Sequence, residues 1–192
     1  MKVQDFFNTA GTKGCYCPQF NYMKRQLSIF RVLTFVLVPF AGLFGLLGLF
    51  ALLGALMNPG ALIPAFLLIA FTIYTFTSLA FLARGIDLGR PLKASLRDWI
   101  RVNAYVSAFL AITSILNLLS VLVMSDAVLR EYMEKALAEQ GTAMPPMMNA
   151  AFLVTAVKII LGFMAVLGVV LLTHIILNFR LIKVYRHLFE LP

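Results

Sequence analysis

Four long apolar stretches dominate this sequence and leave few ways for the chain to fold. They cover residues 32–57, 61–83, 102–124 and 150–178. A helix needs about 20 apolar residues to cross the ~30 Å hydrocarbon core of a membrane, so each stretch is long enough for one crossing. Charged residues make up 12% of the 192-residue chain, roughly half the share that is usual in a soluble domain. We therefore predict an all-α integral membrane protein in which four transmembrane helices form one bundle, without a separate soluble domain.

The charges of the segments between these stretches predict how the chain crosses the membrane. Basic residues outnumber acidic ones in residues 1–31, 84–101 and 179–192, whereas acidic residues outnumber basic ones in 125–149. Because cytoplasmic loops are enriched in Lys and Arg, we place both termini and the 84–101 loop in the cytoplasm. The net charge of +8 then reflects membrane orientation and not a nucleic-acid partner. A bacterial cytoplasmic membrane suits the short loops, and a mitochondrial inner membrane is the alternative.

The basic loop has the pattern of an amphipathic helix near residues 91–101. Pro91 suits the first turn of a helix, and Trp99 falls on the apolar side. We expect the basic side to bind anionic lipid headgroups, with an acidic partner protein as the alternative. The candidate contact residues are Arg90, Lys93, Arg97, Trp99 and Arg101.

A second amphipathic helix is predicted near residues 126–140, beginning at an N-cap formed by Ser125 and Asp126. It belongs to the acidic segment, which we expect on the extracytoplasmic side. Lys158 lies near this end of the last apolar stretch. We expect it to reach the interface or to pair with a glutamate of the acidic segment. The alternative is a functional lysine inside the membrane.

Polar residues form a stripe along the third apolar stretch. Asn103, Ser107, Ser114 and Asn117 are spaced by 4, 7 and 3 residues, which places them on one face of a helix. Such a stripe should point into the bundle, where polar side chains form hydrogen bonds between helices. The alternative is a hydrated pathway that these residues line together with Lys158.

Small residues recur in the first and last apolar stretches at three-residue spacing. Small side chains let helix backbones approach closely in lipid, so we expect packing within the bundle, with an oligomer interface as the alternative. The predicted packing positions are Gly42, Gly45, Gly48, Gly162, Ala165 and Gly168. His174 and Asn178 fall near the cytoplasmic boundary of the last stretch, where we expect a capped or interfacial histidine.

The sequence carries no arrangement that indicates catalysis. All eight acidic residues lie outside the apolar stretches, and Cys15 and Cys17 are too few ligands for a zinc site. We therefore expect no enzyme activity, no metal and no cofactor. The leading hypothesis is an accessory, scaffolding or regulatory subunit that binds other membrane subunits or its own copies. The alternatives are a homo-oligomeric pore or facilitator for a small polar or anionic solute and, more weakly, a binder or sensor of anionic lipid.

Overall fold

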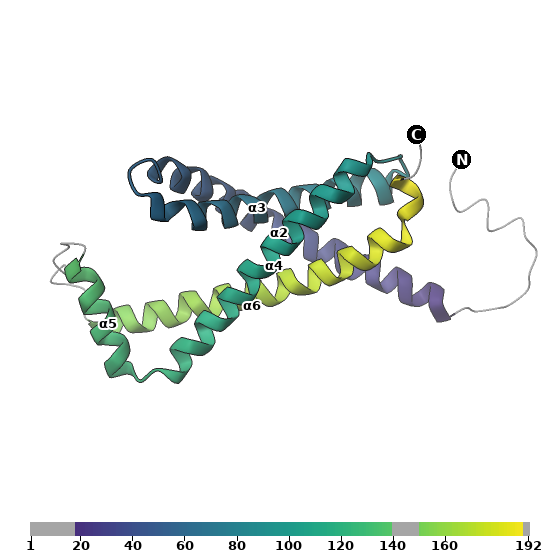
Figure 1. Cartoon of the computed structure of the whole chain (residues 1–192). Coiled ribbons are helices and arrows are strands. Elements are labelled where there is room, and N and C mark those ends of the chain that lie inside the picture. The colour runs from purple at the N-terminus through teal and green to yellow at the C-terminus, as the bar shows by residue number, and fades with distance from the viewer. Residues whose placement is uncertain (1–17, 140–149, 190–192) are drawn as a thin grey trace, which may run out of the picture.

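The computed structural model describes residues 18–139 and 150–189, and these residues are helical over most of their length (Figure 1). Cys15 and Cys17, like the end of the predicted 126–140 helix, lie outside the described residues. The long helices are α2 (Pro18–Gly54), α3 (Leu62–Ala80), α4 (Ala94–Val123) and α6 (Ala150–Val184). The shorter elements are η1 (Pro59–Ala61), the π-helical segment η2 (Phe81–Asp87), α5 (Asp126–Glu139) and η3 (Arg186–Phe189).

Four of these helical segments are long and apolar enough to cross a membrane. They are Met23–Gly54, Pro59–Asp87, Ala94–Val123 and Phe152–Val184. α2 packs along α3, α4 packs along α6, and α3 also packs on α4, so the helices form a bundle. The predicted fold, an all-helical bundle with four candidate membrane spans, is confirmed.

The connecting segments alternate between the two ends of the bundle. The start of α2, the connection from α3 to α4 and the end of α6 lie at one end, whereas η1 and α5 lie at the other (Figure 1). We call the first the basic end, because it carries the basic residues of 84–101 and 179–186. This arrangement agrees with four crossings of the membrane. The assignment of the basic end to the cytoplasm stays a prediction from charge.

The helix predicted near residues 91–101 begins later than expected and is continuous with the third span. The structure extends the second span through η2 to Asp87, and Gly89 then turns the chain with φ +62°. Residues 90–93 are not helical, and α4 runs unbroken from Ala94. The basic side of the predicted 91–101 helix is therefore divided, because Arg90 and Lys93 precede the helix that carries Arg97 and Arg101.

Candidate functional site

A cavity of about 710 Å³ opens at the basic end between α3, η2 and the start of α4. Three cationic side chains line it, and they belong to Arg84, Arg90 and Lys93. Apolar side chains, among them Ile73 and Trp99, form the remaining wall. This combination of a charged side and an apolar side can hold an amphiphilic anion. We call it the basic cavity.

The C-terminal segment holds the wall of the basic cavity in place. The backbone N–H of Leu92 donates to the carbonyl oxygen of Leu188 at 2.8 Å, and the rings of Phe81 and Phe189 stack at 5.6 Å. A Cβ atom at position 85 would lie 2.6 Å from Cδ1 of Leu92, so glycine lets this leucine pack directly on η2 and a larger residue would displace its side chain. Residues 90–93 are thus fixed between η2 and the end of the chain.

The predicted contact residues divide between the basic cavity and the outer surface. Arg90, Lys93 and Trp99 line the cavity, together with Arg84, which was not among them. Arg97 instead donates from Nε to Asp98 at 3.2 Å, and Arg101 is exposed outside the cavity. Helical spacing alone could not find Arg84, because it belongs to η2 and not to the helix predicted near residues 91–101. The turn at Gly89 brings residues 90–93 back to it.

An apolar groove of about 450 Å³ runs between α2 and α3. Gly42, Leu46, Ile69 and Phe76 are among the residues that line it. Ile73 lines both this groove and the basic cavity. The two hollows therefore meet at the same side chain of α3.

A cluster of buried polar side chains joins α2, α3 and α6 close to the basic end. We call it the His174 cluster. The Oγ1 atom of Thr34 lies 2.9 Å from Nε2 of His174, and the hydroxyl of Tyr74 lies 2.8 Å from Nδ1. Nδ2 of Asn178 donates to the hydroxyl of Tyr74 at 3.3 Å and to that of Ser78 at 2.7 Å. All five side chains are buried, and Phe30 stacks on the imidazole at 4.6 Å.

The directions of these hydrogen bonds assign the proton on His174. The hydroxyl of Thr34 donates to the carbonyl oxygen of Phe30 at 2.7 Å, so its oxygen is left to accept from Nε2–H. Nδ1 then accepts from Tyr74, whose oxygen accepts from Asn178. Burial among uncharged side chains favours a neutral imidazole, and in that form all these hydrogen bonds are made with the proton on Nε2. The expectation of an interfacial histidine is wrong, because His174 is fully buried between three helices, whereas both of its ring nitrogens are capped by hydrogen bonds.

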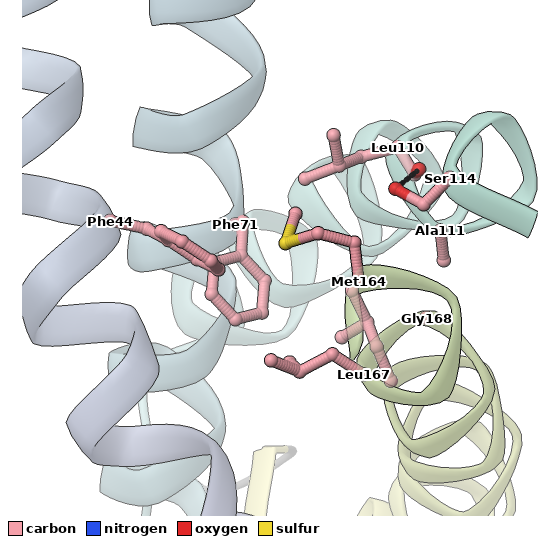
Figure 2. Close-up of a pocket in the computed structure, with 9 residues that line it drawn as sticks. Phe44, Phe71, Leu110, Ala111, Ser114, Met164, Leu167 and Gly168 are labelled. Carbon is pink, nitrogen blue, oxygen red and sulfur yellow. Dashed lines mark hydrogen bonds between the residues drawn. The ribbon is translucent and has the colours of Figure 1, made fainter. Parts of the chain in front are cut away.

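The predicted polar stripe of α4 does not form one lining. Asn103 and Ser107 are buried, and the amide of Asn103 donates to the carbonyl oxygen of Trp99 at 2.9 Å. Ser114 donates to the carbonyl oxygen of Leu110 at 2.9 Å, beside an apolar cavity of about 20 Å³ between the helices (Figure 2). Asn117 is exposed. The structure thus distributes these residues over the interior and the surface of the bundle.

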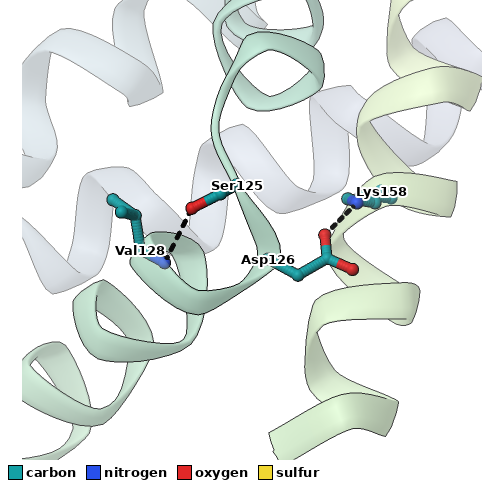
Figure 3. Close-up of polar contacts among 4 residues, drawn as sticks. All are labelled: Ser125, Asp126, Val128 and Lys158. Carbon is teal, nitrogen blue, oxygen red and sulfur yellow. Dashed lines mark hydrogen bonds and ion pairs between the residues drawn. The ribbon is translucent and has the colours of Figure 1, made fainter.

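Lys158, the fifth residue of the predicted lining, pairs with Asp126 at the start of α5. Its Nζ lies 2.5 Å from Oδ1 of the aspartate, and Ser125 caps α5 by accepting from the N–H of Val128 at 3.4 Å (Figure 3). The hydrogen bond from Lys158, and its charge, lower the pKa of Asp126 below its ordinary value. The lysine pairs with a residue of the acidic segment, as expected, but with an aspartate and not a glutamate.

The small residues fall into packed and open positions. A Cβ atom at Gly45 would lie 2.9 Å from Thr72, one at Gly48 would lie 3.1 Å from Ile69, and one at Gly168 would lie 3.0 Å from the carbonyl oxygen of Ala111. Ala165 is also buried. At Gly42 and Gly162 such an atom would meet nothing within 4 Å. Packing within the chain thus accounts for four of the six positions.

Comparison with protein-family models, with curated proteins and with solved structures finds no match for this chain.

Proposed function

We propose that this chain acts by binding, as an accessory or scaffolding subunit that docks onto another membrane protein through α4. The observation that carries the proposal is the amide of Asn117. It is exposed on the surface of α4, and within residues 18–139 and 150–189 no side chain or backbone group forms a hydrogen bond with it.

The position of Asn117 makes this exposure costly. It lies seven residues before Met124, which is about 10 Å along a helix and therefore within the hydrocarbon when α4 spans the membrane. A polar group without a hydrogen bond in such surroundings costs several kcal/mol. Asparagine side chains in membrane helices form hydrogen bonds with neighbouring helices. A partner helix against this face of α4 would supply the missing bond.

A second exposed face of α4, turned roughly 110° around the helix axis from Asn117, can accommodate a further helix along its length. Large apolar side chains on α4 are spaced alternately by three and four residues, as in the contact seam of a coiled coil. They are Val102, Tyr105, Phe109, Ile112, Leu116 and Leu119, each about half exposed or more. In the most apolar 18-residue stretch of α4, 11% of the residues are buried within the chain. In the corresponding stretch of the second span, 44% are buried. α4 therefore offers the more extended surface for a partner.

The test compares Asn117→Leu with Ser114→Ala during purification in mild detergent from the native membrane. Loss of one hydrogen bond between helices should weaken association about 3- to 30-fold, so the Asn117→Leu chain should separate from its complex. Ser114→Ala should leave the complex intact, because the Ser114 hydroxyl already bonds to its own helix. The mass of the complex is the measurement.

The same masses decide what the partner is and whether the proposal holds. A complex whose mass is a multiple of 21.3 kDa identifies further copies of this chain as the partner. Any other protein mass above that of the chain, after subtraction of bound detergent and lipid, indicates a different protein. If Asn117→Leu keeps the complex at the wild-type mass and yield, α4 is not the docking surface.

A further inference from the structure

Among the described residues, the cations of the basic cavity have no ion-pair partner. They belong to Arg84, Arg90 and Lys93, which line it. Asp87, the acidic residue nearest to them in sequence, pairs with Arg31 of α2 instead. A volume of about 710 Å³ is typical of a pocket for a small molecule. Three cations around such a space favour an anionic ligand.

The start of α4 adds to the positive potential of the cavity. Lys93 is its N-cap and makes no side-chain capping bond, and of the first N–H groups of this 30-residue helix only that of Leu96 is engaged within the described residues, donating to the carbonyl oxygen of Lys93 at 3.0 Å. Ser95, in its first turn, lines the cavity. The N-terminus of a helix carries a partial positive charge and suits phosphate groups. It supports the three cations in selecting a phosphate-bearing ligand.

The apolar groove continues from the basic cavity along α2 and α3, toward the middle of the membrane, which is the direction an acyl chain would take. From Arg84 to Ile69, which lines the groove, α3 and η2 cover about 22 Å, enough for one leaflet of a ~30 Å hydrocarbon core. The groove is apolar and open on its outer side at Gly42. A free phosphate would leave it empty, and an acidic peptide has no long apolar chain to fill it.

We infer that the basic cavity and the groove together bind one anionic phospholipid, with its phosphate among Arg84, Arg90 and Lys93 and an acyl chain between α2 and α3. This site lies apart from the exposed face of α4, so it adds to the proposed docking function and does not depend on it. Of the residues that the sequence nominated for lipid contact, it retains Arg90, Lys93 and Trp99 and leaves out Arg97 and Arg101.

Trp99 provides the measurement, because it is the only tryptophan of the chain and lines the cavity. The full chain is placed in phosphatidylcholine vesicles that contain either brominated phosphatidylglycerol or brominated phosphatidylcholine at equal mole fraction. Bromine quenches tryptophan fluorescence at short range. The anionic lipid should quench Trp99 at a lower mole fraction than the zwitterionic one does. Equal quenching by both lipids would overturn the inference.

Charge variants test the headgroup position. Combined Arg84→Gln, Arg90→Gln and Lys93→Gln should raise the mole fraction for half-quenching on the order of 100-fold, since each cation near the surface contributes a factor of about five. The matched control is Arg97→Gln with Arg101→Gln, which should keep the wild-type preference. These five side chains are not fully buried, so the variants should fold, and the melting temperature checks this. A loss in the control in proportion to the two charges that it removes would indicate surface charge alone and contradict the site.

Gly42→Leu tests the groove, because Gly42 lines it and a Cβ atom at this position would meet nothing within 4 Å. It should weaken quenching by long-chain brominated phosphatidylglycerol several-fold and leave binding of a short-chain, water-soluble phosphatidylglycerol unchanged. Inorganic phosphate in solution should not relieve quenching. Relief by phosphate would identify a site for the free anion, and unchanged long-chain binding in Gly42→Leu would exclude the groove. Either result contradicts a phospholipid ligand.

Discussion

The two ends of the bundle are held together in different ways. Near the basic end, the His174 cluster joins α2, α3 and α6 side chain to side chain, and Arg31 of α2 pairs with Asp87 of η2. At the opposite end the described contacts are between pairs of elements. α2 meets α3 at Gly48, and α5 meets α6 at Asp126 and Lys158. η1 and α5 lie well apart there (Figure 1).

This difference shows which part of the molecule can supply a fixed site. In lipid, apolar surfaces gain little from meeting one another, so close packing and hydrogen bonds decide how helices are placed. Three helices that share a buried hydrogen-bonded cluster have one relative position, and the basic cavity is built beside them. Helices that meet in pairs leave their outer faces free, and Asn117 of α4 lies on such a face. We therefore expect substitutions near the basic end to affect stability most.

His174→Ala should have the largest effect on stability. It removes the ring that stacks on Phe30 and leaves the hydroxyl of Tyr74 and that of Thr34 without their shared partner. We expect a loss of about 3 kcal/mol, which corresponds to a fall of roughly 6 to 12 °C in melting temperature for a chain of this size. Thermal unfolding in detergent is the measurement.

His187→Ala is the matched control, because the chain has two histidines and His187 is exposed in η3. Its melting temperature should stay close to that of the wild type. Similar values for both variants would show that the His174 cluster does not hold the three helices together, and the contrast between the two ends would fail.

A second pair of substitutions on α6 tests where its tight packing on α4 stops. Gly168→Ala places a methyl group 3.0 Å from the carbonyl oxygen of Ala111, so one helix must move and stability should fall by about 1 kcal/mol. Gly162→Ala, toward the opposite end, meets nothing within 4 Å and should leave stability unchanged or slightly higher. Thermal unfolding again measures both. A loss at position 162 equal to that at 168 would mean that α6 is packed evenly along its length.

The spans were predictable from the sequence because hydropathy and length are local properties. The basic cavity was only partly predictable. Placing residues around a regular helix near Pro91, at about 100° per residue, takes no account of the π-helical segment or of the turn at Gly89. The His174 cluster was harder to predict. Its members come from three helices, and each polar residue alone is also compatible with a backbone-bonded or interfacial side chain. The four-residue spacings from Tyr74 to Ser78 and from His174 to Asn178 were the available signal, and pairing them requires knowing that α3 faces α6.

The smallest effect is expected at the opposite end, for Asp126→Asn. The lowered pKa of Asp126 means that its pairing with Lys158 stabilises the fold above the ordinary carboxyl value of 3.8, and that this contribution is lost as the pH falls through the lowered value. Both side chains are accessible to solvent, which weakens the pair, so the change should be smaller than that of Gly168→Ala. The wild type should melt slightly above Asp126→Asn at about pH 7, and the two should converge as the pH falls below the lowered pKa of Asp126, where the carboxylate becomes protonated. A difference that persists in acid would show that Asp126 acts through the first turn of α5 and not through Lys158. A pH-dependent difference as large as the His174→Ala effect would show that the opposite end is held as firmly as the basic end.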